Sequence, residues 1–235
     1  MSTTRTKIAD LTARIVGAAD ATTTVVLMHG FGAPGDDLVS LAEYLQRGAG
    51  VNARFVFPEA PIELGGLYGD SRAWWRLDLA KLEAELRNGA IRDRRDEVPE
   101  GLPEVRAQVL EFLDELQATH AIGAEQLVLG GFSQGAMLAL DVALHRAVPP
   151  AGLVLMSGTL LAETEWSPRM PTLKGVPVMQ SHGKHDQLLP FSIAELMRDR
   201  LREAGAVVDW QPFAGGHEIP PPVLAAVAKL LAPRG

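Results

Sequence analysis

A serine between small residues stands near the middle of the chain, in the sequence GFSQG of residues 131–135. An apolar run, QLVLG, precedes it, and a helical pattern, AMLALDVALHRA, follows it. On a sharp strand-to-helix turn a serine is exposed to substrate, and the residues two positions away must be small because the turn folds them against neighbouring elements. G-x-S-x-G also occurs in ordinary connecting turns. With these flanking elements, it predicts Ser133 as the nucleophile of an acyl-transfer reaction.

Such a serine needs two partners. Its hydroxyl ionises too weakly near neutral pH, so a histidine must take the proton and a carboxylate must hold that histidine's tautomer. On a serine turn of this kind the partners follow in the order Asp or Glu, then His. Asp186, in HGKHDQLLP, follows the run VPVMQS, and His217, in GGHE, follows VVDWQPF. We therefore predict Asp186 as the orienting carboxylate and His217 as the base.

Other acidic residues and histidines offer alternatives. Glu218 is adjacent to the predicted base but is expected to point elsewhere, and Asp141 lies two turns along the helix that follows the serine. His182 and His185 resemble a metal-binding pair, but no third or fourth ligand follows at a useful spacing. A turn-stabilising role is predicted for this pair, with no metal and no cofactor.

The sequence HGFG, residues 29–32, follows the first strong apolar run. In a hydrolase with such a serine turn, one oxyanion N–H comes from this position and the other from the residue after the nucleophile. The backbone amides of Phe31 and Gln134 are therefore the predicted oxyanion hole. His29, at the end of a strand, is expected to brace the loop by hydrogen bonding.

The elements that must position these residues alternate along the chain. Strands are predicted at residues 24–28, 55–57, 127–130, 153–156, 176–180 and 207–213, and helices at residues 37–46, 103–118, 134–146, 191–204 and 222–231. This alternation predicts an α/β fold with a mostly parallel central sheet and helices on both faces. Residues 59–101 and 159–175 break the rhythm, and insertions at the carboxyl ends of strands are candidate substrate walls.

Composition narrows the function classes. The 235 residues are 47% hydrophobic and 22% charged, which is typical of one globular domain spanning residues 1–235. A net charge of -7 with scattered basic residues argues against nucleic acid as a partner. The absence of cysteine excludes disulfides and a thiol nucleophile. No apolar run approaches the length of a membrane span, so we do not expect integral membrane association. We expect a cytoplasmic location.

Four motifs, HGFG, GFSQGA, HGKHDQLLP and GGHEIP, occur in this order. Together they resemble the phospholipase/carboxylesterase group of α/β hydrolases, which includes the acyl-protein thioesterases, over residues 24–231. The resemblance implies an α/β-hydrolase fold without a large cap domain, which cleaves esters or thioesters without a cofactor. By position, it implies the triad Ser133, Asp186 and His217 with the oxyanion amides of Phe31 and Gln134.

Two segments depart from the family's pattern. RAWW, residues 72–75, resembles the family's Arg-Ser-Trp-Phe segment near the active site, but Arg76 follows where an aspartate is usual. The oxyanion loop continues as GAPGDD. These differences do not change the residues of the implied triad. They bear on which substrate the protein binds.

Apolar side chains in the irregular stretches are candidate walls for an acyl or aryl group. Trp74, Trp75 and Leu188 are predicted to contact substrate, although either tryptophan could equally fill the core. Leu67 and Tyr68 add to the apolar surface that the tryptophans provide in this stretch, and Leu160 and Leu161 are weaker candidates for the same wall.

The predicted function is a serine carboxylic ester hydrolase that acts through an acyl-enzyme on a small or lipid-like ester. The same triad would serve an acyl-protein thioesterase or a lysophospholipase. A non-catalytic binding protein on a hydrolase scaffold is the alternative from another class.

Overall fold

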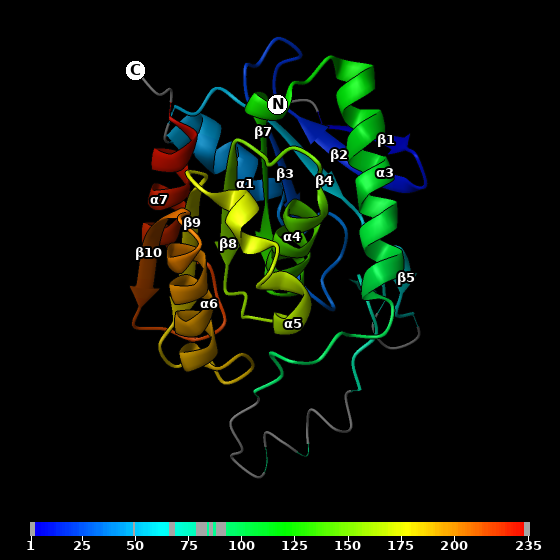
Figure 1. Ribbon diagram of the computed structural model, residues 1–235. Coiled ribbons are helices and arrows are strands. Elements are labelled where there is room, and N and C mark those ends of the chain that lie inside the picture. Colours follow the sequence, from blue (N-terminus) through cyan, green and yellow to red (C-terminus); the bar gives the residue numbers. More distant parts are fainter. Residues whose placement is uncertain are drawn as a thin grey trace.

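The computed structural model describes residues 3–48, 50–65, 69–78, 84, 87 and 93–232, and a mostly parallel sheet forms its centre (Figure 1). Within these residues eight strands pair in the order β1-β2-β4-β3-β7-β8-β9-β10. Their bounds are β1 Thr3–Ile8, β2 Leu11–Val16, β3 Thr24–Met28, β4 Arg54–Pro58, β7 Leu127–Phe132, β8 Gly152–Met156, β9 Pro177–Gly183 and β10 Val207–Phe213. The pairs that involve β2 are antiparallel, and those from β4 to β10 are parallel.

Helices cover both faces of the sheet. The helices are α1 Val39–Glu43, α3 Leu102–His120, α4 Gln134–His145, α5 Glu163–Trp166, α6 Phe191–Glu203 and α7 Pro221–Leu231, and a π-helical turn, Tyr44–Gly48, continues α1. Helices α3, α4, α5 and α6 cover one face of the sheet, and α1 and α7 cover the other (Figure 1). Side chains of the first group share one core cluster, and those of the second belong to the other. Short 3₁₀ turns occur at Ala124–Gln126 and Met170–Leu173. Two short strands of two residues each, β5 (Ile62–Glu63) and β6 (Arg72–Ala73), pair antiparallel.

The central strands read as continuous apolar runs because both of their faces are buried. In β3, Val26 and Met28 point into one core cluster, whereas Val25 and Leu27 point into the other. Successive side chains of a strand point to opposite faces, so each layer of helices requires its own apolar set. This arrangement confirms the predicted α/β architecture of a mostly parallel sheet with helices on both faces.

The carboxyl ends of the parallel strands form one rim of the sheet. Ser133 follows β7, Asp186 lies three residues after β9, and His217 lies four residues after β10. These strands belong to the adjacent run β7-β8-β9-β10. Residues far apart in the sequence are therefore brought to one edge, where ligands bind in open parallel sheets.

The N-terminal hairpin of β1 and β2 was absent from the sequence prediction. β1 is an edge strand whose residues are largely exposed, and it offers little apolar periodicity. Its position depends on pairing with β2, which in turn pairs with β4 through residues some forty positions away. Within the described residues, no helix combines the length and apolar character that crossing a bilayer requires.

Candidate active site

The turn between β7 and α4 holds Ser133 in a strained backbone conformation. Its φ of 55° and ψ of -119° lie where side-chain-bearing residues are rare. A Cβ on Gly131 would lie 2.4 Å from the Met28 carbonyl oxygen, and one on Gly135 would lie 2.0 Å from the same oxygen. The Ser133 N–H donates to the Met156 carbonyl at 2.8 Å. Both glycines of GFSQG are thus required sterically, and the serine lies at the entrance of the helix as predicted.

Asp186 and His217 meet in a short hydrogen bond. Nδ1 of His217 lies 2.7 Å from Oδ2 of Asp186, and with Nδ1 protonated the imidazole donates to the carboxylate. The other carboxylate oxygen, Oδ1, accepts the N–H groups of Leu188 and Leu189, each at 2.9 Å. These contacts fix the orientation of the carboxylate, and they leave Nε2 of His217 available as a proton acceptor.

The environment of Asp186 keeps its carboxyl group ionised. Burial alone would raise its pKa, but the hydrogen bond and charge interaction with His217, together with the Leu189 N–H, outweigh burial and lower the pKa below its ordinary value. The side chain is fully buried, whereas that of His217 is 16% exposed. A buried anion that contacts the inner nitrogen of a histidine at a cavity wall can orient that histidine as a general base.

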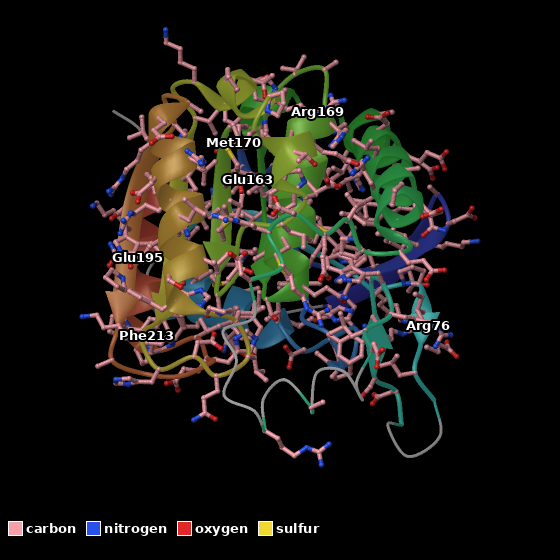
Figure 2. The ribbon with its side chains drawn as sticks, turned by 60° about the horizontal axis from the view of Figure 1, so that its bottom comes forward. Arg76, Glu163, Arg169, Met170, Glu195 and Phe213 are labelled. Carbon is pink, nitrogen blue, oxygen red and sulfur yellow. The ribbon has the colours of Figure 1, made fainter. Side chains whose placement is uncertain are left out.

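Ser133 and His217 line the same cavity, which has a volume of about 410 Å³. The ring of Phe132 packs against the His217 imidazole with centroids 4.7 Å apart. The rim is turned toward the viewer in Figure 2, where Phe213, the last residue of β10, and Arg76 lie on opposite sides of the molecule. The nucleophile and base candidates therefore face one space that is large enough for a small ligand.

The two predicted oxyanion amides also lie at this cavity. Phe31 and Gln134 both line it, and Gly30 approaches closely enough that an added Cβ would lie 3.4 Å from that of Ser133. Across the described ranges, no protein acceptor bonds the N–H of Phe31 or of Gln134. Free backbone donors beside a nucleophile can stabilise a developing oxyanion.

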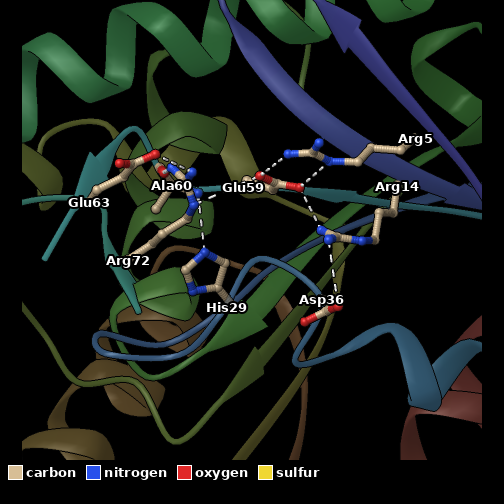
Figure 3. A network of polar contacts seen from close by, with 8 residues as sticks. All are labelled: Arg5, Arg14, His29, Asp36, Glu59, Ala60, Glu63 and Arg72. Carbon is tan, nitrogen blue, oxygen red and sulfur yellow. Dashed lines mark hydrogen bonds and ion pairs between the residues drawn. The ribbon is translucent and has the colours of Figure 1, made fainter. Parts of the chain in front are cut away.

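His29 braces the oxyanion loop. With Nδ1 protonated it donates to the Gly30 carbonyl at 2.8 Å, and Nε2 accepts the Ala60 N–H at 3.1 Å (Figure 3). The residue is 2% exposed, and burial lowers its pKa. Both nitrogens are used within the protein, so the imidazole ties the end of β3 to the end of β4, in keeping with the bracing role expected from the sequence.

The buried histidines predict a pH-dependent stability. Because burial places the pKa of His29 and that of His182 below the unfolded value of about 6.5, the unfolded chain binds more protons as the pH falls through that value. The free energy of unfolding should therefore decrease between about pH 7.5 and about pH 5.5. Urea unfolding of wild type and His29→Gln at both pH values tests this. The variant should lose less stability on acidification, and identical losses would contradict the assignment.

The rival carboxylates are occupied elsewhere. Arg106 binds Asp141 through two parallel contacts, Nε to Oδ2 at 2.5 Å and Nη2 to Oδ1 at 2.9 Å, and the indole of Trp166 donates to Oδ1 at 2.8 Å. Glu218 accepts the Gly216 N–H at 3.2 Å. Asp141 thus links α4 to α3 and α5, and neither residue competes with Asp186 for the imidazole.

Removing the charge of Asp141 should lower stability without impairing chemistry. Asp141 is fully buried and the Arg106 side chain is 14% exposed, so Asp141→Asn removes the buried anion and leaves Arg106 with only the more exposed Glu165 as a charge partner, at 3.2 Å. We expect a loss of about 3–5 kcal/mol in the free energy of unfolding, measured by guanidinium unfolding. Turnover per active site, counted by covalent labelling of the serine, should stay within about twofold of wild type, because Asp141 is not one of the candidate reacting groups. A large loss of turnover would make Asp141 part of the site.

His182, for which the sequence predicted a turn-stabilising role, lies beside Asp186. It is fully buried, its Nε2 lies 3.0 Å from the Leu189 carbonyl oxygen, and the same nitrogen lies 3.4 Å from Oδ2 of Asp186. Among the described residues, no three His, Cys, Asp or Glu side chains gather as a metal site would need. His182 therefore closes the turn that carries Asp186.

The cavity wall includes two of the three predicted substrate contacts. Trp75 and Leu188 line it, together with Leu160 and Leu161. Trp74 does not belong to the lining: it is 1% exposed and its indole N–H donates to the His29 carbonyl at 2.8 Å. It fills the core and braces the loop, because the turn places adjacent side chains on different sides. Leu67 and Tyr68, which were grouped with the tryptophans, lie outside the described residues.

Several lining residues were missed from the sequence. Phe132 precedes the serine, Met137 lies one helical turn after Ser133, and Ile193 lies in the first turn of α6, after the Asp186 turn. The spacing of four between Ser133 and Met137 is a signal that could have found the second of these. Charged residues also line the cavity: Asp37, Arg76, Asp78, Arg94, Glu97 and Glu100.

Known proteins are similar to this chain in both sequence and fold. The sequence profile of the Phospholipase/Carboxylesterase family matches residues 12–233. Acyl-protein thioesterase 1 of Neurospora crassa is 27% identical over 209 residues, which cover 86% of this chain and 83% of the relative. The protein of the same name from Gibberella zeae is 30% identical over 220 residues, 91% of each chain. The crystal structure of esterase PE8 superimposes with a TM-score of 0.79 at 28% identity, covering 94% of this chain and 97% of the other.

Proposed function

The chain belongs to the Phospholipase/Carboxylesterase family of α/β hydrolases, and from this premise we propose that it hydrolyses carboxylic esters through an acyl-enzyme on Ser133. One observation carries the proposal. The hydrogen bond between Asp186 and His217 orients an imidazole at the wall of the cavity that also contains the strained serine turn. An oriented base and an exposed nucleophile in one cavity are the requirements of acyl transfer.

The reaction proceeds in two halves. Oγ of Ser133 attacks the ester carbonyl carbon while Nε2 of His217 takes the hydroxyl proton, and the carbonyl electron pair moves onto the oxygen. The amides of Phe31 and Gln134 donate to that oxyanion. When the bond to the leaving alcohol breaks, His217 returns the proton to the alcohol oxygen. A water molecule, deprotonated by the same nitrogen, then attacks the acyl-enzyme, and the acid leaves as Ser133 regains its proton.

The walls of the cavity indicate an apolar acyl group. Trp75, Met137, Leu160, Leu161 and Ile193 line the cavity that Ser133 also lines, and Leu188, another lining residue, is 39% exposed. Such lining favours hydrocarbon over a charged or peptide group. The volume of about 410 Å³ lies toward the lower end of the range for ligand pockets, which favours short and medium acyl chains.

A second candidate function is thioester hydrolysis on an acylated protein. It is favoured by the relatives named acyl-protein thioesterase 1, which match most of this chain. The proposed triad would cleave a thioester or a lysophospholipid ester by the same steps, since the oxyanion and the acyl-enzyme are common to all three. The leaving group and the acyl length separate these candidates.

Hydrolysis of p-nitrophenyl esters from acetyl to palmitoyl, beside acyl-coenzyme A thioesters of the same lengths, tests the proposal. We expect kcat/KM to be highest for esters between butyryl and octanoyl. A maximum at palmitoyl with a preference for thioesters would instead support the second candidate. No turnover of any substrate by folded protein would contradict both.

Covalent labelling identifies the nucleophile independently of substrate choice. A fluorophosphonate probe should phosphonylate Ser133, and mass spectrometry of the digested protein should place the adduct on the peptide that contains GFSQG. Prior denaturation should abolish labelling because the activated serine depends on the folded base. An adduct on another serine would move the active site.

A further inference from the structure

Residues 72–75, here called the clamp segment, connect the two halves of the oxyanion hole. One half is the loop after β3, which carries Phe31, and the other is the start of α4, where Gln134 lies. The two halves are about one hundred residues apart in the sequence. Among the described residues, the clamp segment is hydrogen-bonded to both halves.

The clamp segment holds the loop on both sides of Phe31. Gly32 donates its N–H to the Arg72 carbonyl at 2.9 Å, and the Arg72 N–H donates to the Ala33 carbonyl at 3.0 Å. On the other side, the indole N–H of Trp74 donates to the His29 carbonyl at 2.8 Å. Three hydrogen bonds therefore fix the backbone around the Phe31 amide without using that amide.

The side chain of Gln134 fastens the other half. Its Oε1 accepts the Trp74 N–H at 2.9 Å, and its Nε2 donates to the Trp75 carbonyl at 2.9 Å. The residue is 2% exposed, so these are buried contacts with well-formed distances. The amide side chain therefore bonds to one backbone group of each of two consecutive residues of the clamp segment.

The clamp segment is itself anchored to the end of β4. The Arg72 guanidinium donates through Nη1 to the Ala60 carbonyl at 2.9 Å and through Nη2 to Glu63 at 2.7 Å, and its Nε lies 3.8 Å from the Glu59 carboxylate (Figure 3). Arg5 and Arg14 also bind Glu59, which is 5% exposed. The pKa of Glu59 is lowered: burial raises it, but the three arginines outweigh burial. The ionised Glu59 carboxylate thus helps to hold Arg72, the first residue of the clamp segment.

We propose that the Gln134 side chain is a positioning group, which sets the separation of the Phe31 and Gln134 amides by fastening the clamp segment to the nucleophile turn. This inference rests on the proposed esterase function, since it needs an oxyanion to act upon. Backbone donors stabilise an oxyanion only when they are held at its location in advance. A displacement of about 1 Å in such a site costs on the order of 100-fold in rate.

Gln134→Met tests the proposal. Methionine is close to glutamine in length and keeps the backbone N–H of residue 134, but it cannot pair with the Trp74 and Trp75 backbone. We expect kcat to fall by about 10- to 100-fold while KM changes by less than about threefold, as for a group that acts only on the transition state. The affinity for a trifluoromethyl ketone, which forms a tetrahedral oxyanion on the serine, should fall in parallel with kcat/KM.

Gln180→Met is the matched control. Gln180 is another fully buried glutamine whose Nε2 donates to a backbone carbonyl, that of Ala194 at 2.8 Å, and it lies outside the cavity lining. Its replacement should lower the unfolding midpoint and leave kcat per labelled site within about twofold of wild type. Counting active sites with the fluorophosphonate corrects every variant for its folded fraction.

Trp74→Phe provides a second variant from the opposite end of the clamp. It removes the indole N–H that bonds the His29 carbonyl and keeps an aromatic ring in the core. We expect a smaller loss of kcat than in Gln134→Met. The variant that carries both substitutions should lose less activity than the product of the two single losses, because both substitutions act through the clamp segment.

Two results would overturn the proposal. One is a Gln134→Met enzyme whose kcat per labelled site stays within about twofold of wild type. The other is a loss carried by KM with unchanged affinity for the trifluoromethyl ketone. Failure of the proposed function is distinguishable from either, because wild-type Ser133 would then not react with the fluorophosphonate.

Discussion

Ser133→Ala should lower kcat for p-nitrophenyl esters by about 10⁴- to 10⁶-fold, since removal of a nucleophilic serine abolishes the covalent route altogether. The alanine leaves the cavity, the oxyanion amides and the Asp186–His217 pair in place. Only water activated by the imidazole could then attack the carbonyl, and that reaction lacks the orientation that the turn imposes on Oγ. KM should change little because the walls that hold the acyl group remain.

The folded state of the variant is the necessary control. Ser133 has a φ of 55°, and alanine is at least as strained there, so the unfolding midpoint should be compared with that of wild type. Binding of the acid product, followed by calorimetry, would show that the cavity is intact. Full activity in folded Ser133→Ala would overturn the assignment of the nucleophile.

Asp186→Asn is expected to lower kcat by about 10⁴-fold, the effect seen when such a carboxylate becomes an amide. The reason lies in the two backbone donors at Oδ1, from Leu188 and Leu189. The asparagine carbonyl must face these N–H groups, which turns its NH₂ toward Nδ1 of His217. Nδ1 must then accept, the ring proton moves to Nε2, and Nε2 cannot take the proton from Ser133.

Stability separates this effect from simple unfolding. The lowered pKa of Asp186 means that its ionised form stabilises the folded state above the unfolded value of about 3.9, and that this contribution is lost as the pH falls below it. The stability difference between wild type and Asp186→Asn should therefore shrink as the pH falls below that value. Asp141→Asn should instead lose stability and retain its turnover. Equal turnover in both variants would contradict the proposed triad.

Much of the fold could be predicted from the sequence because its signals are local. A strand buried on both faces is apolar at almost every position, and residues 24–28 match β3 in full. Residues 207–213 match β10 in full although β10 is a half-exposed edge strand, because valine, tryptophan and phenylalanine favour the extended conformation. The hairpin of β1 and β2 was missed because an exposed edge strand carries almost no apolar pattern, and pairing with a distant strand stabilises it instead.

The candidate site was predictable to the extent that chemistry restricts residue type and order. A serine needs a histidine and a carboxylate, and the chain offers Asp186 and His217 after suitable strands. The division of labour between Trp74 and Trp75 was not predictable, since adjacent residues in an irregular segment have no period to separate their faces. Their roles follow from the contacts of Trp74 with His29 and of both backbones with Gln134.

The sequence by itself determined the serine turn, since Gly131 and Gly135 leave room for a tight approach that any side chain would block. It also determined the order of the candidate reacting groups and the strands after which they lie. Only the tertiary structure decided which carboxylate meets the imidazole, which tryptophan lines the cavity and what the Gln134 side chain binds. Local steric and periodic requirements are written in neighbouring residues, whereas hydrogen bonds between groups some sixty positions apart exist only after the chain has folded.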